Sequence, residues 1–369
     1  MAGNGTQIDL QHSSELTREE RFAGCILGTA LGDALGLKRE GLSRARASRI
    51  YGDAPLEMNF FLGQGYCSDD TEHTVMLSRA LIGCGGDLNE LERRLASDFK
   101  VWLLAIPAGI GLATLRSIVK LWVGFGPERS GVSSAGNGPA MRSAILGLWA
   151  ESEEELRVWV KKSTRLTHTD PRAEEGAYAI ALATHLSLQE KLTPAQVVGE
   201  IGKRVNGEEL RANLAAVEKG LCSGLGPKQF AETMGWHTGV SGYINQTVPC
   251  ALYCWAEGGH DFRRGVENAV MLGGDSDSVA AITGAVAGAN LGDSALPQLW
   301  LERLGEWPRD IGWMRKLAKQ LAEAQHLNNT SANPHVSPPR MLWPQTLVRN
   351  LLFTSVVLGI AFRRLLPPY

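Results

Sequence analysis

Leu272-Gly-Gly-Asp-Ser-Asp-Ser-Val-Ala-Ala-Ile-Thr-Gly-Ala-Val-Ala-Gly-Ala289 joins two acidic side chains to a long run of small apolar residues. Gly273 and Gly274 permit a tight turn, so Asp275 and Asp277 can converge on one point. The apolar residues that follow recur at the spacing of one helix face, which predicts a helix over 278–291. A buried helix that begins with clustered acids is costly unless positive charge lies beside it. We therefore expect a metal ion at its start.

A second acidic cluster, Ser68-Asp69-Asp70-Thr71, precedes another predicted helix. Acids in a first helical turn are common because they complement the helix dipole. Taken alone, this cluster would be interpreted as a cap, but its similarity to the cluster at 275–278 favours a shared site. Asp33 lies on an otherwise apolar helix. Two interpretations of Asp33 stay open: a structural bond to a neighbouring loop, or support for a metal ligand.

Length and composition limit the classes of protein to which this chain can belong. With 369 residues, 44% of them apolar, the chain can bury a large core in one large domain or in two or three domains. The formal net charge is −2 and the body of the chain has no strongly basic stretch, which argues against nucleic acid as the main partner. Six scattered cysteines and a polar N-terminus without an apolar segment predict free thiols, no signal peptide and a cytoplasmic location.

Hydrophobic periodicity predicts an all-α protein, because few segments alternate with period two. Thr17 and Glu20 predict a capping box at the start of a helix that ends near Gly36. Residues 38–66 are predicted to form an irregular loop. The further predicted helices include 88–104, 171–186, 245–257, 261–271 and 310–325. The predicted organisation is a flexible tail (1–17), a catalytic domain (18–325), a linker (326–341) and an apolar C-terminal extension (342–369).

The C-terminal extension contains an uncharged apolar run, Leu351 to Phe362, flanked by Arg349 and by Arg363-Arg364. Twelve residues are too few to span a bilayer as a helix, which needs about 20. We expect this run to pack against the domain or against a second copy of the chain. Attachment to a membrane surface through 347–366 is the alternative.

A glycine-rich loop, Gly131-Val-Ser-Ser-Ala-Gly-Asn-Gly138, offers backbone N–H groups that can bind phosphate. Such loops are also plain connectors, and this one lacks the lysine of a P-loop. Farther on, His168 precedes Asp170-Pro171, a predicted helix start. A histidine at such a place is most often structural.

The order and spacing of six motifs resemble those of the ADP-ribosylglycohydrolase family, which includes the ADP-ribosylarginine hydrolases. The resemblance covers about residues 18–325. The motifs are Gly24-Cys-Ile-Leu-Gly28, Gly32-Asp33-Ala-Leu-Gly36, Ser68-Asp69-Asp70-Thr71, Gly136-Asn-Gly-Pro-Ala-Met-Arg142, Thr167-His168 and Gly273-Gly-Asp275-Ser-Asp277.

The resemblance implies a compact, orthogonal multi-helix domain with a central cleft that holds two Mg²⁺ or Mn²⁺ ions. The metal ligands that it implies are Ser68, Asp69, Asp70, Asp275, Asp277 and Ser278. It places Glu40 on a flexible loop that gates the site and His168 near the ribose. The loop that contacts the diphosphate and ribose would contain Ser134, Gly136, Asn137 and Gly138. Ala135 stands where the family often has an aromatic residue, so we do not expect adenine stacking there.

The residue types agree with this chemistry. Acids and hydroxyls, without Cys or His, favour hard cations such as Mg²⁺ or Mn²⁺ over zinc. Two divalent ions would offset the repulsion among the carboxylates and make a bound water more acidic. Asp69 or Asp70 is the expected general acid or base. The predicted activity is hydrolysis of the ribose C1″ glycosidic bond in an ADP-ribosylated protein, first of all at arginine, or in a small-molecule ADP-ribose conjugate.

Three other interpretations compete with this one. The first is a catalytically inactive ADP-ribose-binding or crystallin-like relative, which the complete set of predicted ligands argues against. The second is a two-metal phosphohydrolase, which would need the histidine ligands that are missing here. The third is a helical protein with incidental acidic caps, which would need several coincidences in the right order.

Overall fold

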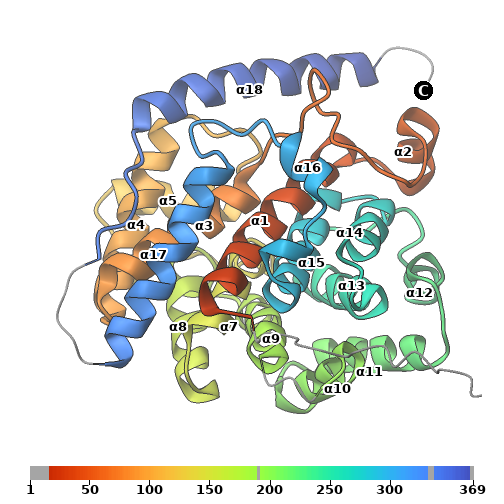
Figure 1. Ribbon diagram of the computed structural model, residues 1–369, viewed down its shortest axis with the longest axis horizontal. Coiled ribbons are helices and arrows are strands. Elements are labelled where there is room, and N and C mark those ends of the chain that lie inside the picture. Colours follow the sequence, from red (N-terminus) through yellow and green to blue (C-terminus); the bar gives the residue numbers. More distant parts are fainter. Residues whose placement is uncertain (1–15, 189–191, 331–335, 366–369) are drawn as a thin grey trace, which may run out of the picture.

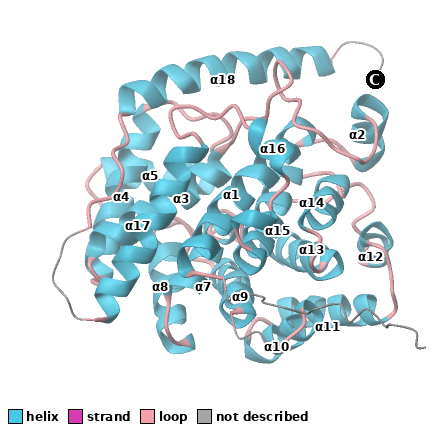
Figure 2. Cartoon of the chain, viewed as in Figure 1, coloured by secondary structure: helices cyan, strands magenta, loops and turns pink. Residues whose placement is uncertain are grey.

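The computed structural model describes residues 16–188, 192–330 and 336–365. Over these ranges the chain forms α-helices, three short 3₁₀-helices and isolated β-bridges, and it forms no β-strand (Figure 2). The predicted all-α class is confirmed. Of the predicted N-terminal tail, residues 1–15 lie outside the described residues.

The first half of the chain forms α1 (Arg18–Gly36), α2 (Arg44–Tyr51), α3 (Asp69–Cys84), α4 (Leu88–Leu104), α5 (Leu112–Trp122), α6 (Pro127–Ser130), α7 (Ala144–Trp149), α8 (Glu153–Arg165) and α9 (Pro171–Ser187). The second half forms α10 (Pro194–Arg204), α11 (Glu208–Cys222), α12 (Pro227–Thr233), α13 (Ile244–Gly258), α14 (Phe262–Met271), α15 (Ser276–Leu291), α16 (Gln298–Glu302), α17 (Ile311–Asn329) and α18 (Trp343–Arg364). The 3₁₀-helices are η1 (Leu37–Arg39), η2 (Ala140–Arg142) and η3 (Asp293–Ala295).

Helices α1 and α15 form the centre of the molecule and run antiparallel with their backbones in close contact (Figure 1). A Cβ atom added to Gly28 would lie 2.1 Å from the Gly284 carbonyl oxygen, and one added to Gly24 would lie 2.0 Å from that of Gly288. The contact therefore requires glycine. At its far end, the same packing brings Gly36 against the backbone of Asp277, so the end of α1 meets the start of α15.

Helices α3, α13, α14 and α17 surround this central pair. Nearly every apolar residue of α1 and α15 is buried, as are those on the inner faces of the surrounding helices. This one contiguous core explains why the small residues of the 272–289 stretch are tolerated: they permit close packing of backbones rather than filling space with large side chains.

The boundaries of the strongly periodic helices agree closely with their predictions. Helix α1 begins after Thr17, which forms the predicted capping box with Glu20, and it ends at Gly36. Helix α15 begins at Ser276, two residues before the predicted 278–291. Helix α17 continues to Asn329, four residues beyond the predicted 325. The first four residues of the predicted linker are therefore helical. Asn329 donates a hydrogen bond to Glu151 (2.8 Å), which holds this last turn.

Helices α2, α5, α6 and α12 lie where none was predicted. The predicted loop 38–66 contains α2, whose sequence is too polar to show an apolar period, although Ser43 caps it by accepting from the Arg46 N–H. The glycine-rich segment after residue 104 contains α5, with four buried residues on one face.

The apolar run at the C-terminus belongs to a longer helix than predicted. Helix α18 has 22 residues, so the argument that the run is too short to cross a membrane is wrong. Among the described residues, α18 is the one helix that is long and apolar enough to do so. This test rests on length and composition alone. One face of α18 packs on the domain, where Phe353 stacks on Phe60 at 5.6 Å between ring centroids.

Candidate active site

The two predicted acidic clusters meet where α1 ends and where α3 and α15 begin. Ser276 Oγ donates to the Gly36 carbonyl at 2.9 Å, which ties the start of α15 to the end of α1. Ser278 Oγ donates to Asp70 Oδ2 at 3.3 Å, which joins the two clusters directly across 208 positions of sequence. The N-terminal ends of α3 and α15 both lie at this place, and their dipoles favour negative charge there.

Asp33 holds the turn that leads into α3. Its carboxylate accepts hydrogen bonds from the Ser68 N–H (2.9 Å), the Thr71 N–H (3.1 Å) and Thr71 Oγ1 (2.5 Å). Asp33 is fully buried, and burial raises its pKa to about 6 while these hydrogen bonds oppose the shift. The structure thus shows Asp33 in the first of its two interpretations, as a residue that bonds a neighbouring loop. That loop contains the predicted ligands Ser68, Asp69 and Asp70.

Asp70 and Asp277 are buried acids with unmet hydrogen-bonding capacity. Among the described residues, Asp70 Oδ1 and Asp277 Oδ1 have no hydrogen-bond partner. Burial raises the pKa of both carboxyls well above the usual value, and the neighbouring acids raise it further. An unpartnered buried oxygen is costly, and a cation beside these two oxygens would remove that cost.

The donor set fits Mg²⁺ or Mn²⁺, since it consists of carboxylate and hydroxyl oxygens. Within the part of the chain that the structure describes, no three Asp, Glu, His or Cys side chains already form a group that could hold a metal ion. The two-metal centre therefore stays a prediction. What supports it is the meeting of the predicted ligands at one place, with two buried oxygens available.

The glycine turn before Asp275 is required by both backbone angle and space. Gly273 and Gly274 have φ of +69° and +78°, a region that L side chains rarely adopt. A Cβ on Gly274 would lie 2.1 Å from the Val240 carbonyl oxygen. Gly274 also bridges to Leu42 and Val240, so this turn joins the Glu40 segment to the segment before α13.

The predicted diphosphate loop lies beside the acids. Asn137 Nδ2 donates to Asp275 Oδ2 (2.6 Å) and to Thr247 Oγ1 (3.0 Å), which fixes the amide on the cluster. Ser134 Oγ accepts from the Gly136 N–H at 3.2 Å and shapes the loop. The loop therefore places the Asn137 side chain against the predicted ligand Asp275, while the N–H groups of Gly136 and Asn137 bond to Ser134 and Gly242.

His168 lies directly beneath this loop. A Cβ on Gly138 would be 3.1 Å from His168 Cε1, and one on Gly136 would be 3.3 Å from Nε2. His168 is buried, and its Nδ1 lies 2.9 Å from Thr167 Oγ1. Burial, together with the nearby charge of Arg142, lowers its pKa to about 3. The neutral ring supports the loop from below.

Arg142 is a site-supporting residue that the sequence analysis did not identify. Its guanidinium donates to the Gly138 carbonyl (2.9 Å) and to Thr167 Oγ1 (2.8 Å), and so joins the loop to the His168 segment. Its side chain is fully buried, and burial lowers its pKa to about 9. The signal for it was its position at the end of the Gly-Asn-Gly-Pro-Ala-Met-Arg motif.

Glu40 is exposed between two cavities. An open cavity of about 460 Å³ lies on the side of Asp275, and the segment Thr238–Gly242 forms its opposite wall. Gly242 accepts from the Asn137 N–H at 3.0 Å, so this cavity adjoins the predicted diphosphate loop. The sequence analysis missed the segment 238–242, whose only signal was two glycines in five residues. A smaller cavity lies against Ser68, Asp69 and Asp277.

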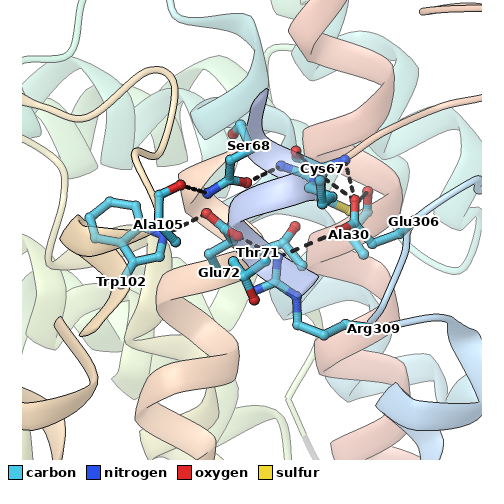
Figure 3. A network of polar contacts seen from close by, with 12 residues as sticks. Ala30, Cys67, Ser68, Thr71, Glu72, Trp102, Ala105, Glu306 and Arg309 are labelled. Carbon is cyan, nitrogen blue, oxygen red and sulfur yellow. Dashed lines mark hydrogen bonds and ion pairs between the residues drawn. The ribbon is translucent and has the colours of Figure 1, made fainter. Parts of the chain in front are cut away.

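A buried ionic network supports the first turn of α3 (Figure 3). Glu72 accepts from Trp102 Nε1 (2.6 Å) and pairs with Arg309. Glu306 accepts from the Cys67 N–H at 3.1 Å. The Arg309 pairing lowers the pKa of Glu72 against the effect of its burial. Glu72 therefore belongs to the scaffold, although it lies only two residues from Asp70.

Comparison with known proteins shows the family of this chain. The profile of the family described as ADP-ribosylglycohydrolase matches residues 14–331. The chain belongs to the ADP-ribosylglycohydrolase family. It is 32% identical to an "uncharacterized protein" of Archaeoglobus fulgidus over 83% of this chain and 97% of that one. It is 27% identical to the ADP-ribosylarginine hydrolase Tri1 of Pseudomonas putida over 82% of this chain and 78% of that one.

A solved structure described as an ADP-ribosylglycohydrolase-related protein complex is similar to this chain with a TM-score of 0.63 and 28% identity. The similarity covers 84% of this chain and 99% of the solved chain. The resemblance noted from the six motifs is thus confirmed. The family match ends at residue 331, so α18 lies beyond it.

Proposed function

We propose that this protein is a metal-dependent hydrolase that cleaves the ribose C1″ glycosidic bond of ADP-ribosylated acceptors and releases ADP-ribose, with ADP-ribosyl-arginine on protein as the first candidate substrate. One observation is the main support: Ser278 bonds Asp70 across the two acidic clusters, beside buried carboxylate oxygens that have no partner among the described residues.

The residues that would hold Mg²⁺ or Mn²⁺ are Ser68, Asp69, Asp70, Asp275, Asp277 and Ser278. When bound, these ions would orient the ribose hydroxyls and increase the acidity of a bound water. Asn137 donates to one oxygen of Asp275 and so orients this carboxylate within the cluster. The second bond of Asn137, to Thr247, orients its amide.

Asp69 is the better candidate for proton transfer than Asp70. Asp70 is enclosed and accepts hydrogen bonds from both Ser68 and Ser278. Asp69 is partly exposed and lines the smaller cavity. Burial in the cleft and the neighbouring acids raise the pKa of Asp69, which would allow its carboxyl to hold a proton for the leaving group at neutral pH. Cleavage at C1″ develops positive charge on the ribose, and the other carboxylates of the cleft would stabilise that charge.

The test is release of ADP-ribose by the purified full chain with Mg²⁺ or Mn²⁺, measured by chromatography on arginine-linked and serine-linked substrates. We expect release from at least one of them and its loss in Asp277→Asn. Asp98→Asn, a change in an acid paired with Arg79 away from the cleft, is the matched control and should keep activity. Absence of release from every substrate would contradict the proposal; tight calorimetric binding of ADP-ribose in that case would favour the inactive-relative alternative.

A cytoplasmic location stays a prediction, supported by cysteines that are all free in the structure, five of them buried. Membrane-surface attachment or self-association through 347–366 also stays a prediction. Its support is the outer face of α18, where large apolar side chains are exposed at Val348, Leu351, Leu352, Leu358 and Phe362.

A further inference from the structure

Helix α18 covers one side of the candidate active site. The smaller cavity holds only about 80 Å³, whereas sites for small-molecule ligands span about 300–1,000 Å³. One wall of this cavity contains the predicted ligands Ser68, Asp69 and Asp277. The opposite wall comes from α18, through Phe353, Val357, Ile360, Ala361 and Arg364. With α18 in this position, an acceptor joined to ADP-ribose cannot approach Asp69 from this side.

We propose that α18 is an autoinhibitory lid, whose C-terminal half must leave the cleft before an ADP-ribosylated acceptor reaches Asp69. This inference rests on the proposed function, because it concerns the regulation of the same site. It adds a segment that lies outside the family match, which ends at residue 331.

The N-terminal half of α18 is firmly anchored. Arg349 is buried and donates to Glu306 (2.6 Å) and to the Cys67 carbonyl (2.5 Å). Asn350 is fully buried and donates to the Ala105 carbonyl at 2.9 Å. Removing a buried charge from such a pairing is expensive. This half of the helix therefore stays on the domain and provides a fixed end for the lid.

The C-terminal half is held less tightly. Phe353, Leu37 and Phe60 form a small apolar cluster that is separate from the main core, and Val357 and Ile360 add partly buried side chains to it. Beyond it, Arg364 donates to the carbonyls of Lys38 (2.6 Å) and Glu40 (3.1 Å). The bond to Glu40 is exposed and the bond to Lys38 is partly buried, so water can replace them at lower cost than it could replace the buried bonds of Arg349.

Arg364 also couples the lid to the segment that contains Glu40. Its bond to the Glu40 carbonyl holds the residue that lies between the two cavities. Arg46 donates to the Arg364 carbonyl at 2.8 Å, which adds α2 to the same arrangement. Release of Arg364 would free the Glu40 segment and open a path between the small cavity and the open one of about 460 Å³.

The test compares charge placed on the two faces of α18 in the full chain. Val357→Asp with Ile360→Asp puts carboxylates against the cleft, where apolar contacts hold the lid. Leu351→Asp with Leu358→Asp puts the same number of charges on the exposed face and is the matched control. We expect kcat/KM for release of ADP-ribose from an ADP-ribosylated protein to rise at least about tenfold in the inner-face variant, because a larger fraction of molecules is open. The outer-face variant should stay within about twofold of the parent.

Amide hydrogen exchange provides a readout that needs no catalysis. In the inner-face variant, exchange over residues 37–42 should become faster, while exchange in α15 should not change. Arg364→Ala, which leaves the apolar contact intact, should also make exchange over 37–42 faster. If the inner-face variant fails to fold, this single variant tests the lid in its place.

Unchanged or slower turnover in the inner-face variant, with unchanged exchange over 37–42, would overturn the lid and make α18 a fixed wall. Absence of ADP-ribose release from all variants, together with faster exchange over 37–42 in the inner-face variant, would instead contradict the proposed hydrolase activity and retain the lid.

Discussion

Asp33 shows how one buried carboxylate can organise a site that it does not itself form. Its three hydrogen bonds fix the backbone of Ser68 and Thr71. These two residues flank Asp69 and Asp70 in the sequence. Mutation of residues that orient metal ligands in this way typically weakens metal binding by about 10- to 100-fold.

Asp33→Asn is therefore expected to weaken binding of Mn²⁺ by about 10- to 100-fold, because an amide has one acceptor oxygen for three donors. Calorimetric titration of the purified protein with Mn²⁺ measures the change. Asp98→Asn is the control and should keep the parent affinity. Equal affinity in the Asp33 variant and the parent would mean that Asp33 has only a structural role.

His168 gives a pH dependence of stability that can be worked out from its burial. In the folded protein its pKa is about 3, whereas an unfolded histidine titrates near about 6.5. Below pH 6.5 the unfolded chain takes up a proton that the folded chain refuses, so unfolding is favoured as the pH falls. This one histidine lowers the free energy of unfolding by at most about 1.4 kcal/mol per pH unit. The loss ends near the folded pKa, below which both states bind the proton.

Urea unfolding at pH 7 and pH 5 should therefore show a smaller loss of stability in His168→Asn than in the parent. The comparison uses the difference between the two proteins, because the cleft acids, whose pKa values are raised, act in the opposite direction in both of them. His260→Asn, a change in an exposed turn, is the matched control. Equal losses in His168→Asn and the parent would contradict the expectation.

At the scale of elements, the contact of α1 with α15 depends on the absence of side chains. The glycines of each helix face the backbone of the other, and this close contact sets the distance between Asp33 on α1 and Asp277 on α15. The position of the second acidic cluster thus follows from helix packing and not from its own sequence.

Gly28→Ala is expected to cost about 3 kcal/mol or more, because its Cβ would meet the Gly284 carbonyl, which is backbone and cannot move aside. Gly202→Ala offers the matched control, since it lies in α10 and its Cβ would meet only Leu214 Cβ at 3.9 Å. That change should stabilise the protein by up to about 1 kcal/mol. Denaturant unfolding gives both values, and a similar loss in the two variants would refute the packing argument.

At the scale of the whole molecule, metal binding should stabilise the fold, because the predicted ligands come from two distant segments, 68–70 and 275–278. Mn²⁺ or Mg²⁺ at about 100 times its dissociation constant would add about 2.7 kcal/mol to the free energy of unfolding. The gain should shrink as the pH falls from 7 to 5, because protons compete for carboxylates whose pKa values are raised. Thermal unfolding with metal and with EDTA measures it.

The double change Asp275→Asn with Asp277→Asn sharpens this prediction. Without metal the variant should melt above the parent, since two repelling carboxylates are gone. With metal the order should reverse, because only the parent is stabilised. A variant that still gains stability from metal would place the metal elsewhere.

Much of this molecule was predictable because the signals are local. The capping box at Thr17, the spacing of apolar residues in α1 and the acids at the starts of α3 and α15 each act within a turn or two of helix. The same holds for the residue types of the candidate site, whose oxygens alone indicate a hard cation. Those features determined the all-α class and, in their order, the family.

Only the tertiary structure decided what these elements do to one another. Helix α2 has no apolar period to reveal it. Arg142 supports the site through Thr167, which lies 25 positions away in the sequence. Asp33 acquires its role from its hydrogen bonds to the start of α3. The position of α18 is the clearest case, because Arg364 contacts Glu40 across 324 positions of sequence. An apolar run predicts burial without naming the surface that buries it. That surface forms only when distant segments pack together, and here it is the mouth of the candidate active site.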